Sequence, residues 1–193
     1  MFDLLHKNFA KHIALSSDEL QRSTKYFVPK KMRRGQFLLH NGEVSRFTAF
    51  VNKGCLRLYS IDANGEEHVV QFAIEDWWIG DMYSSLTGHP ASYNIDALEN
   101  SELLLLEHSL MEKLCLDIPE FERYFRLILQ NSFIAKERRI ASTLSQSAEE
   151  RYLALVKSYP EIAKRVPLHQ IASFLGITPQ SLSRIRKELA EKK

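Results

Sequence analysis

Cysteine is scarce in this 193-residue chain, which contains only Cys55 and Cys115. Neither has a second cysteine at the short spacing of a zinc or iron–sulfur site, so a cysteine-built metal site within one chain is excluded. Isolated thiols are typical of reduced, buried apolar groups. The histidines are also scattered: His68 has no histidine two residues away, and His89 precedes Pro90 in an expected turn. We therefore expect no bound metal.

Long apolar runs are missing as well. No segment approaches the roughly 18 consecutive apolar residues that a membrane helix needs. Residues 1–7 lack the charged-then-apolar layout of a signal peptide, so we expect a cytosolic protein with no membrane partner. The sequence also lacks a His-x-His metal signature, a glycine-flanked nucleophilic serine and a pair of catalytic acids, and we do not expect an enzyme.

The net charge of +2 is small but unevenly distributed. The segment from Lys164 to the C-terminus contains seven Lys or Arg residues and two Glu residues, which gives it a net charge of +5. The preceding 163 residues therefore carry a net charge of −3. A basic terminal module on a mildly acidic body suits a partner rich in phosphate. The alternative, a basic tail that serves solubility, explains only Lys192 and Lys193.

The most informative stretch runs from residue 168 to 189 and predicts two helices joined by a tight turn. Gly176 can adopt the left-handed conformation that ends a helix. Thr178 can cap the next helix, and Pro179 suits its first position because the missing N–H would have no partner there. Ile177 and Leu182 occupy the positions of a hydrophobic staple. These features predict a helix-turn-helix.

The second of these helices has two faces when its side chains are placed at about 100° per residue. Leu182, Ile185 and Leu189 form an apolar stripe, whereas the opposite face carries groups that can bind base edges and phosphates. The alternative is an ordinary helical hairpin with a solvated charged face. The residues that we expect to contact DNA are Thr178, Pro179, Gln180, Ser183, Arg184, Arg186 and Lys187, with His169 on the outer side of the first helix.

Between about residues 31 and 108 the apolar residues alternate, and turn residues interrupt the pattern every eight to twelve positions. The segments 37–40, 55–60, 68–72, 93–98 and 101–107 are predicted strands. Asn64-Gly65 between two of them is a strong hairpin signal. Many short strands at this spacing predict an antiparallel barrel or jelly roll.

After Pro119 the period becomes helical for about 26 residues, with two apolar stripes. We expect one stripe to pack on the barrel and the other on the same helix of a second subunit. In the alternative, a monomer, the second stripe packs on the terminal module. The expected dimer stripe consists of Phe121, Phe125, Ile128, Ser132 and Ala135.

A barrel, a long helix and a terminal helix-turn-helix, in this order, resemble the Crp/Fnr family of bacterial transcription regulators. The resemblance is most specific at residues 53–59, 78–81 and 171–184. It implies an α+β protein with a sensor jelly roll and N-terminal helices over 1–117, a dimerisation helix over 118–145 and a winged-helix-type helix-turn-helix over 146–193. It also implies a homodimer that places two recognition helices in successive major grooves of near-palindromic double-stranded DNA, with RNA polymerase as a further candidate partner.

The resemblance also points to an effector pocket. Cyclic-nucleotide-binding members have a Gly-Glu pair, matched here by Gly80 and Asp81, and an arginine, replaced here by Ala91. Because a buried cyclic phosphate without a cation is unfavourable, we expect weak or no binding of cyclic AMP. The pocket then holds a different effector or none, and no cofactor is required. Its expected residues are Gly80, Asp81, Tyr83, Ser84, Ser85, Ser92 and Tyr93.

Two functions remain open at this point. The first is a homodimeric, sequence-specific DNA-binding transcription regulator. The second is a ligand-binding sensor module whose terminal helices contact protein. Iron–sulfur sensing, which Crp/Fnr members perform with several N-terminal cysteines, is not expected because no cysteine precedes Cys55.

Overall fold

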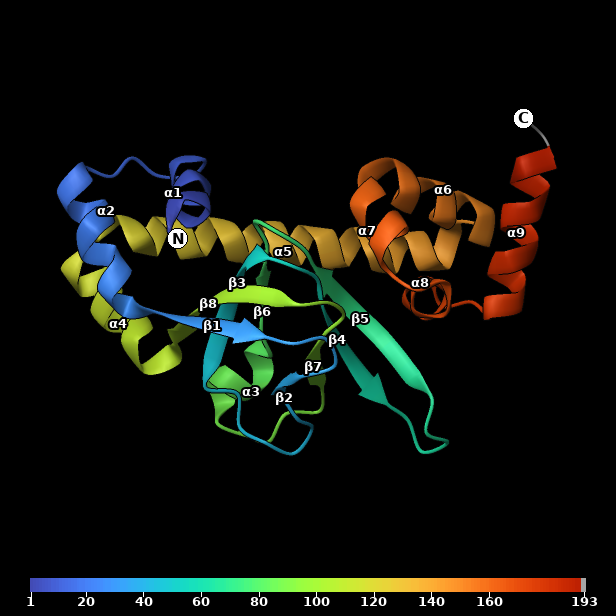
Figure 1. The fold of residues 1–193 in the computed structure, drawn as a ribbon, viewed down its shortest axis with the longest axis horizontal. Coiled ribbons are helices and arrows are strands. Elements are labelled where there is room, and N and C mark those ends of the chain that lie inside the picture. Colours follow the sequence, from blue (N-terminus) through green and yellow to red (C-terminus); the bar gives the residue numbers. More distant parts are fainter. Residues whose placement is uncertain (192–193) are drawn as a thin grey trace.

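The computed structural model describes residues 1–191. Two antiparallel four-stranded sheets face each other and form the jelly roll (Figure 1). The first sheet has the order β1 (Phe27–Met32), β8 (Ser101–Glu107), β3 (Phe47–Lys53) and β6 (Trp78–Ile79). The second has the order β2 (Phe37–Leu39), β7 (Asn94–Ala97), β4 (Leu56–Ile61) and β5 (Glu67–Ala73). The predicted hairpin at Asn64-Gly65 joins β4 to β5 and is confirmed.

Helices precede the strands of the jelly roll, interrupt them once and follow them in the sequence. Before β1 lie α1 (Asp3–Ala10), α2 (Ser17–Ser23) and the short 3-10 helix η1 (Thr24–Tyr26), and α3 (Met82–Thr87) follows β6. The remaining helices are α4 (His108–Asp117), α5 (Glu120–Ser145), α6 (Ala148–Ser158), α7 (Pro160–Arg165), α8 (Leu168–Leu175) and α9 (Pro179–Glu191). Within residues 1–191 no strand follows Glu107, so the helix-turn-helix has no β-hairpin wing there.

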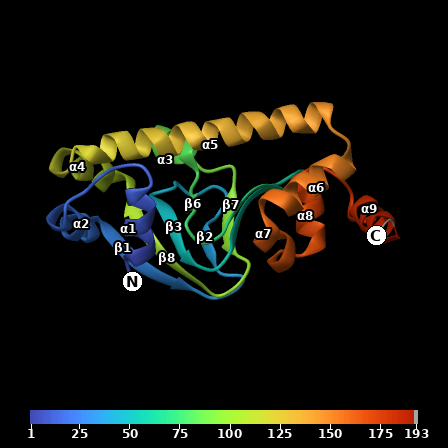
Figure 2. The ribbon, with the colours of Figure 1, turned by 90° about the horizontal axis from the view of Figure 1, so that it is seen from above.

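The long helix α5 has the predicted length of 26 residues. It extends along one side of the whole molecule, from the N-terminal helices at one end to the terminal helices at the other (Figure 2). Among residues 1–191, no helix has the length and apolar character needed to cross a membrane.

Three apolar cores hold these elements together. The first fills the jelly roll, with Leu56, Ile79 and Ile95 among its fully buried members. The second packs the outer face of the first sheet against α1, α4 and the start of α5. The third joins the outer face of the second sheet to α6, α7, α8 and α9, so it spans the predicted sensor and DNA-binding domains.

Strands β1 and β3 were not among the predicted strands. Strand β1 contains Pro29 and lies at the edge of its sheet, where a proline is tolerated but weakens the sequence signal. Strand β3 lies between two cores: Ala49 and Val51 face the jelly-roll interior, whereas Phe50 faces the core under the N-terminal helices. A strand buried on both faces has no polar alternation to reveal it.

A substitution at Gly54, in the turn between β3 and β4, tests this fold. Its φ is +109°, and an added Cβ would lie 2.6 Å from the Ser101 Cβ and 2.7 Å from the Ser101 Cα. Gly54→Ala is therefore expected to lower the free energy of unfolding by about 2–5 kcal/mol. The matched control is Gly65→Ala, where φ is +83° but nothing lies within 4 Å of the added Cβ. Urea unfolding measures both variants, and equal losses would contradict the close approach at Ser101.

Candidate nucleic-acid interface

The turn between α8 and α9 forms as its residues predict. Gly176 ends α8 in the left-handed conformation, with φ of +66°. Its N–H donates to the Ser173 carbonyl at 3.0 Å. The Thr178 hydroxyl accepts a hydrogen bond from the Ser181 N–H at 3.2 Å, and α9 begins at Pro179. The predicted turn chemistry is confirmed.

Helix α9 has one buried and one exposed face. Leu182 and Ile185 are buried against the rest of the terminal module, and Leu189 is half-buried. The opposite face is open to solvent, at the end of the molecule farthest from the N-terminal helices (Figure 1). All the residues expected to contact DNA are exposed: Thr178, Pro179, Gln180, Ser183, Arg184, Arg186, Lys187 and His169.

The cations on the exposed face of α9 have only weak intramolecular partners. The Arg184 Nε lies 3.9 Å from a Glu188 carboxylate oxygen, and the Arg184 side chain is 74% exposed. The Lys187 Nζ lies 3.9 Å from a Glu191 carboxylate oxygen. Exposed pairs at such distances are easily exchanged for phosphate oxygens. An arginine can also donate two hydrogen bonds to guanine, and a glutamine can pair with adenine.

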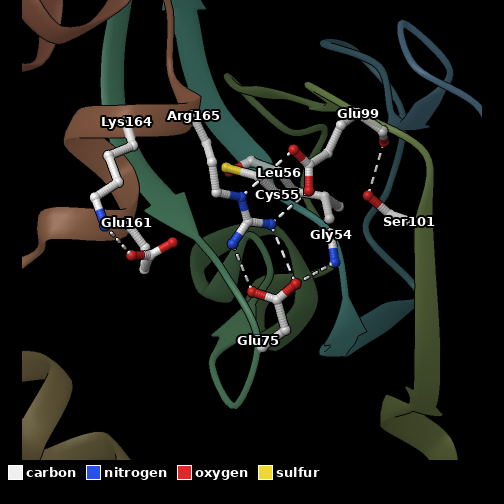
Figure 3. A network of polar contacts seen from close by, with 9 residues as sticks. All are labelled: Gly54, Cys55, Leu56, Glu75, Glu99, Ser101, Glu161, Lys164 and Arg165. Carbon is white, nitrogen blue, oxygen red and sulfur yellow. Dashed lines mark hydrogen bonds and ion pairs between the residues drawn. The ribbon is translucent and has the colours of Figure 1, made fainter.

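Not every cation of the basic terminal segment is available to a polyanion. Arg165, at the end of α7, pairs with Glu75 and Glu99 of the sensor domain, so the expectation that its charge serves phosphate binding is corrected (Figure 3). Lys192 and Lys193, which contribute to the terminal charge, lie outside the described residues. The cations of this segment that remain exposed among residues 1–191 are therefore Lys164 on α7 and Arg184, Arg186 and Lys187 on α9.

The predicted dimer stripe on α5 is partly wrong. Phe121 is fully buried against Phe9 of α1, with ring centroids 4.9 Å apart, and is not available to a second subunit. Phe125 and Ile128 are half-buried against the same core, whereas Ser132 and Ala135 are exposed. The large apolar side chains that α5 leaves exposed on another face are Leu129, Phe133, Ile140 and Leu144.

This exposed apolar stripe on α5 lies on one side of the helix. At about 100° per residue its four side chains fall within about 60° of one another, roughly a quarter turn from the predicted stripe. Phe133 is 65% exposed and Leu144 is 83% exposed. A continuous row of large apolar side chains on a free helix face is typical of an interface between subunits.

The residues of the predicted effector pocket are largely occupied within the sensor domain. The Asp81 carboxylate is buried and caps α3 by accepting the Ser84 N–H at 3.0 Å. The Ser84 hydroxyl donates to the His89 carbonyl at 2.7 Å and accepts the Ser45 N–H at 2.9 Å. An added Cβ on Gly80 would lie 3.1 Å from the Thr48 hydroxyl, so Gly80 permits close packing on β3. These contacts give the three residues structural roles, and the second Asp81 carboxylate oxygen, Oδ2, is buried without a hydrogen-bond partner among residues 1–191.

The other predicted pocket residues do not converge on a cavity. Tyr83 is exposed and stacks on His89, and the Ser85 hydroxyl donates to the Met82 carbonyl within α3. Ser92 is exposed, and Tyr93 packs against the jelly-roll core. None of the predicted residues lines the cavity of about 450 Å³ on the jelly roll, although the lining residue Ser45 is hydrogen-bonded to Ser84. The cavity is lined by Leu38, Leu39, Glu43, Val44, Ser45, Arg46, Phe47 and Ile95.

The tip of the β4–β5 hairpin gathers Asp62, Glu66 and His68, which sequence spacing alone did not bring together. One Asp62 oxygen accepts the backbone N–H groups of Asn64 and Glu66 at 2.8 and 3.0 Å. The other lies 2.9 Å from the His68 Nε2. The cluster therefore stabilises the hairpin turn.

Comparisons with known proteins agree with this architecture. Residues 29–117 match the family model of the cyclic nucleotide-binding domain. The chain is 21% identical to the fumarate and nitrate reduction regulatory protein of Vibrio cholerae, over 89% of this chain and 72% of that protein. It is 24% identical to the regulatory protein HlyX of Actinobacillus pleuropneumoniae, over 89% of this chain and 75% of that protein.

The fold is likewise shared with a solved structure. FixK2 from Bradyrhizobium japonicum superimposes with a TM-score of 0.69 at 17% identity, covering 86% of this chain and 85% of that one. Over most of its length the chain is similar to transcription regulators of the Crp/Fnr type. In this chain, the thiol at residue 55 is buried between the jelly roll and the terminal helices, and burial raises the pKa of Cys55 to about 12. It is thus a packing residue.

We expect that cyclic phosphate does not bind at the predicted effector site of this chain. Ala91, which the resemblance predicts in place of the arginine of cyclic-nucleotide-binding members, is 2% exposed and packs in the apolar jelly-roll core. A phosphate placed there would lose its hydration without gaining a cation. We therefore expect 1 mM cyclic AMP to leave the thermal unfolding midpoint unchanged. A saturable rise in the midpoint would contradict this account of the pocket.

The contacts between the jelly roll and the terminal helices had no local signal in the sequence. Ser173 of α8 donates its hydroxyl to the Glu67 carbonyl at 2.6 Å and accepts the Val69 N–H at 2.9 Å. Arg139 of α5 also reaches the carbonyl groups of β5 and α8. Both side chains join segments far apart in the chain, which periodicity within one helix cannot predict.

Proposed function

We propose that this Crp/Fnr protein regulates transcription as a homodimer that inserts α9 of each subunit into the major groove of a near-palindromic operator. The observation that carries the proposal is the exposed polar face of α9, opposite a buried apolar face and directly after a capped turn. Gln180, Ser183 and Arg184 would read bases, and Arg186 and Lys187 would bind phosphates. Thr178, Pro179 and His169 border this surface.

The dimer in this proposal forms through the exposed apolar stripe on α5, defined by Leu129, Phe133, Ile140 and Leu144. A two-fold contact along this stripe would cover all four side chains in both copies. Two recognition helices related by this symmetry would contact half-sites centred about 34 Å apart, one turn of the duplex.

Thermal unfolding with different ligands tests the proposed function. A duplex that contains the operator is expected to raise the unfolding midpoint, because only the folded protein binds it. Cyclic nucleotides at millimolar concentration are expected to have no effect. Stabilisation by nucleotide without any binding to DNA would instead favour a sensor module whose terminal helices contact protein.

A further inference from the structure

The helix-turn-helix is docked on the sensor domain rather than tethered to it. Tyr59 and Phe72, on the outer face of the second sheet, belong to the same buried core as Ile171 and Leu175 of α8. The Phe72 ring lies 5.2 Å from the Phe174 ring, measured between centroids. This packing gives the terminal helices one defined place on the sheet.

Arg165 fastens the docked domain at one side (Figure 3). Its guanidinium donates to both Glu75 oxygens, at 2.7 and 3.1 Å, and also bonds the Glu99 carboxylate. The Glu75 carboxylate accepts the Gly54 N–H at 2.7 Å. Burial pushes the pKa of Glu75 upwards, but the hydrogen bonds from Arg165 and Gly54 outweigh it and leave the pKa below its usual value. Glu75 thus stays charged and paired.

Arg139 of the long helix α5 holds the helix-turn-helix on the jelly roll at a second place. From α5, its guanidinium donates to the Val69 carbonyl at 3.1 Å and to the Phe174 carbonyl at 2.8 Å, and it also bonds the Val70 carbonyl. The guanidinium carbon lies 4.0 Å from the centre of the Phe174 ring. One side chain therefore connects α5, the sensor strand β5 and α8.

The docked position leaves the DNA-reading face free. The contacts with the sensor domain involve α7 and α8, through Arg165 and Ser173, whereas Gln180 and Arg184 on α9 remain exposed. Docking therefore fixes the direction of α9 relative to α5 without covering it. In a dimer built on α5, this direction determines where the two recognition helices stand relative to each other.

We propose that Arg139 and Arg165 are positioning residues that set the half-site spacing that the dimer accepts. The inference rests on the proposed function. Inserting one base pair between the half-sites moves them apart by about 3.4 Å and rotates one relative to the other by about 35°. A rigidly docked helix-turn-helix cannot follow such a change, whereas a released one can turn on its connection to α5.

The test compares binding to operators that differ only in half-site spacing. Operators with the selected spacing, and with one base pair added or removed, are titrated by fluorescence anisotropy. The unmodified protein is expected to lose at least about 10-fold in affinity at the altered spacings. Arg165→Ala and Arg139→Ala are expected to reduce this loss to less than about 3-fold, while discrimination against a base change within one half-site persists.

Two further variants separate positioning from charge. Glu75→Gln with Glu99→Gln removes the partners of Arg165 but makes the protein more positive, so it should relax spacing as Arg165→Ala does without weakening binding to random duplex. Lys164→Ala removes the same charge as Arg165→Ala from the neighbouring position, where Lys164 pairs with Glu161 in the same helix. This variant should keep the spacing preference of the unmodified protein.

The outcomes distinguish the two proposals. Unchanged spacing discrimination in Arg139→Ala, Arg165→Ala and the Glu75→Gln, Glu99→Gln variant, all shown by circular dichroism to be folded, would overturn the positioning role. Loss of binding to every spacing and to single half-sites in a folded variant would also overturn it, because the defect would then lie in the reading of DNA. Absence of sequence-specific binding by the unmodified protein would instead refute the proposed function.

Discussion

Phe133→Glu is expected to convert the dimer into a monomer and to lower operator affinity by at least about 100-fold. Phe133 lies in the middle of the exposed apolar stripe on α5 and is 65% exposed in the single chain. In a two-fold interface the substitution would bury two like charges without partners, and uncompensated buried charges cost several kcal/mol. Sedimentation equilibrium measures the oligomeric state, and anisotropy titration measures the affinity.

The matched control for this prediction is Asn131→Glu. Residue 131 is exposed on the opposite side of α5, so the substitution adds the same charge away from the stripe. This variant should remain dimeric and bind the operator normally. A Phe133→Glu protein that is still a dimer would contradict the proposed interface.

Arg184→Ala is expected to cost roughly 1–3 kcal/mol in each half-site at one guanine and to relax specificity there. The Arg184 guanidinium is exposed and has only a distant Glu188 partner, so it is free to donate two hydrogen bonds to the O6 and N7 of a guanine. Affinities for operators with each base at that position measure the effect. Because a lost base contact removes discrimination, the variant should bind all four bases at that position alike.

Lys187→Ala provides the comparison for Arg184. Lys187 is also exposed on α9, and we expect it to contact phosphate. Its removal should weaken binding to operators and to random duplex alike and should reduce the salt dependence of binding. If Arg184→Ala weakened both kinds of DNA by the same factor, its assignment as a base-reading residue would be wrong.

Features that depend on neighbours in the sequence were predicted well. The turn at Gly176, Thr178 and Pro179 was correct because helix ends are determined by the conformations and hydrogen bonds of a few adjacent residues. The Asn64-Gly65 hairpin was correct for the same reason. The exposed polar face of α9 followed from its helical period alone.

Features that depend on tertiary packing were predicted poorly. The helical period of α5 did not single out the stripe that contains Phe133, which is 65% exposed, and it could not show that Phe121 is buried against Phe9 of α1. Arg165 was grouped with the DNA-binding charges because its acidic partners, Glu75 and Glu99, are far away in the chain. Neither assignment had a local signal that could correct it.

Selection of bound duplexes from a random DNA pool tests most directly whether α9 reads DNA. The unmodified protein is expected to enrich a two-fold symmetric consensus whose half-sites are centred about one helical turn apart. Failure to enrich any sequence over the starting pool, under conditions where the protein is folded and dimeric, would contradict the account.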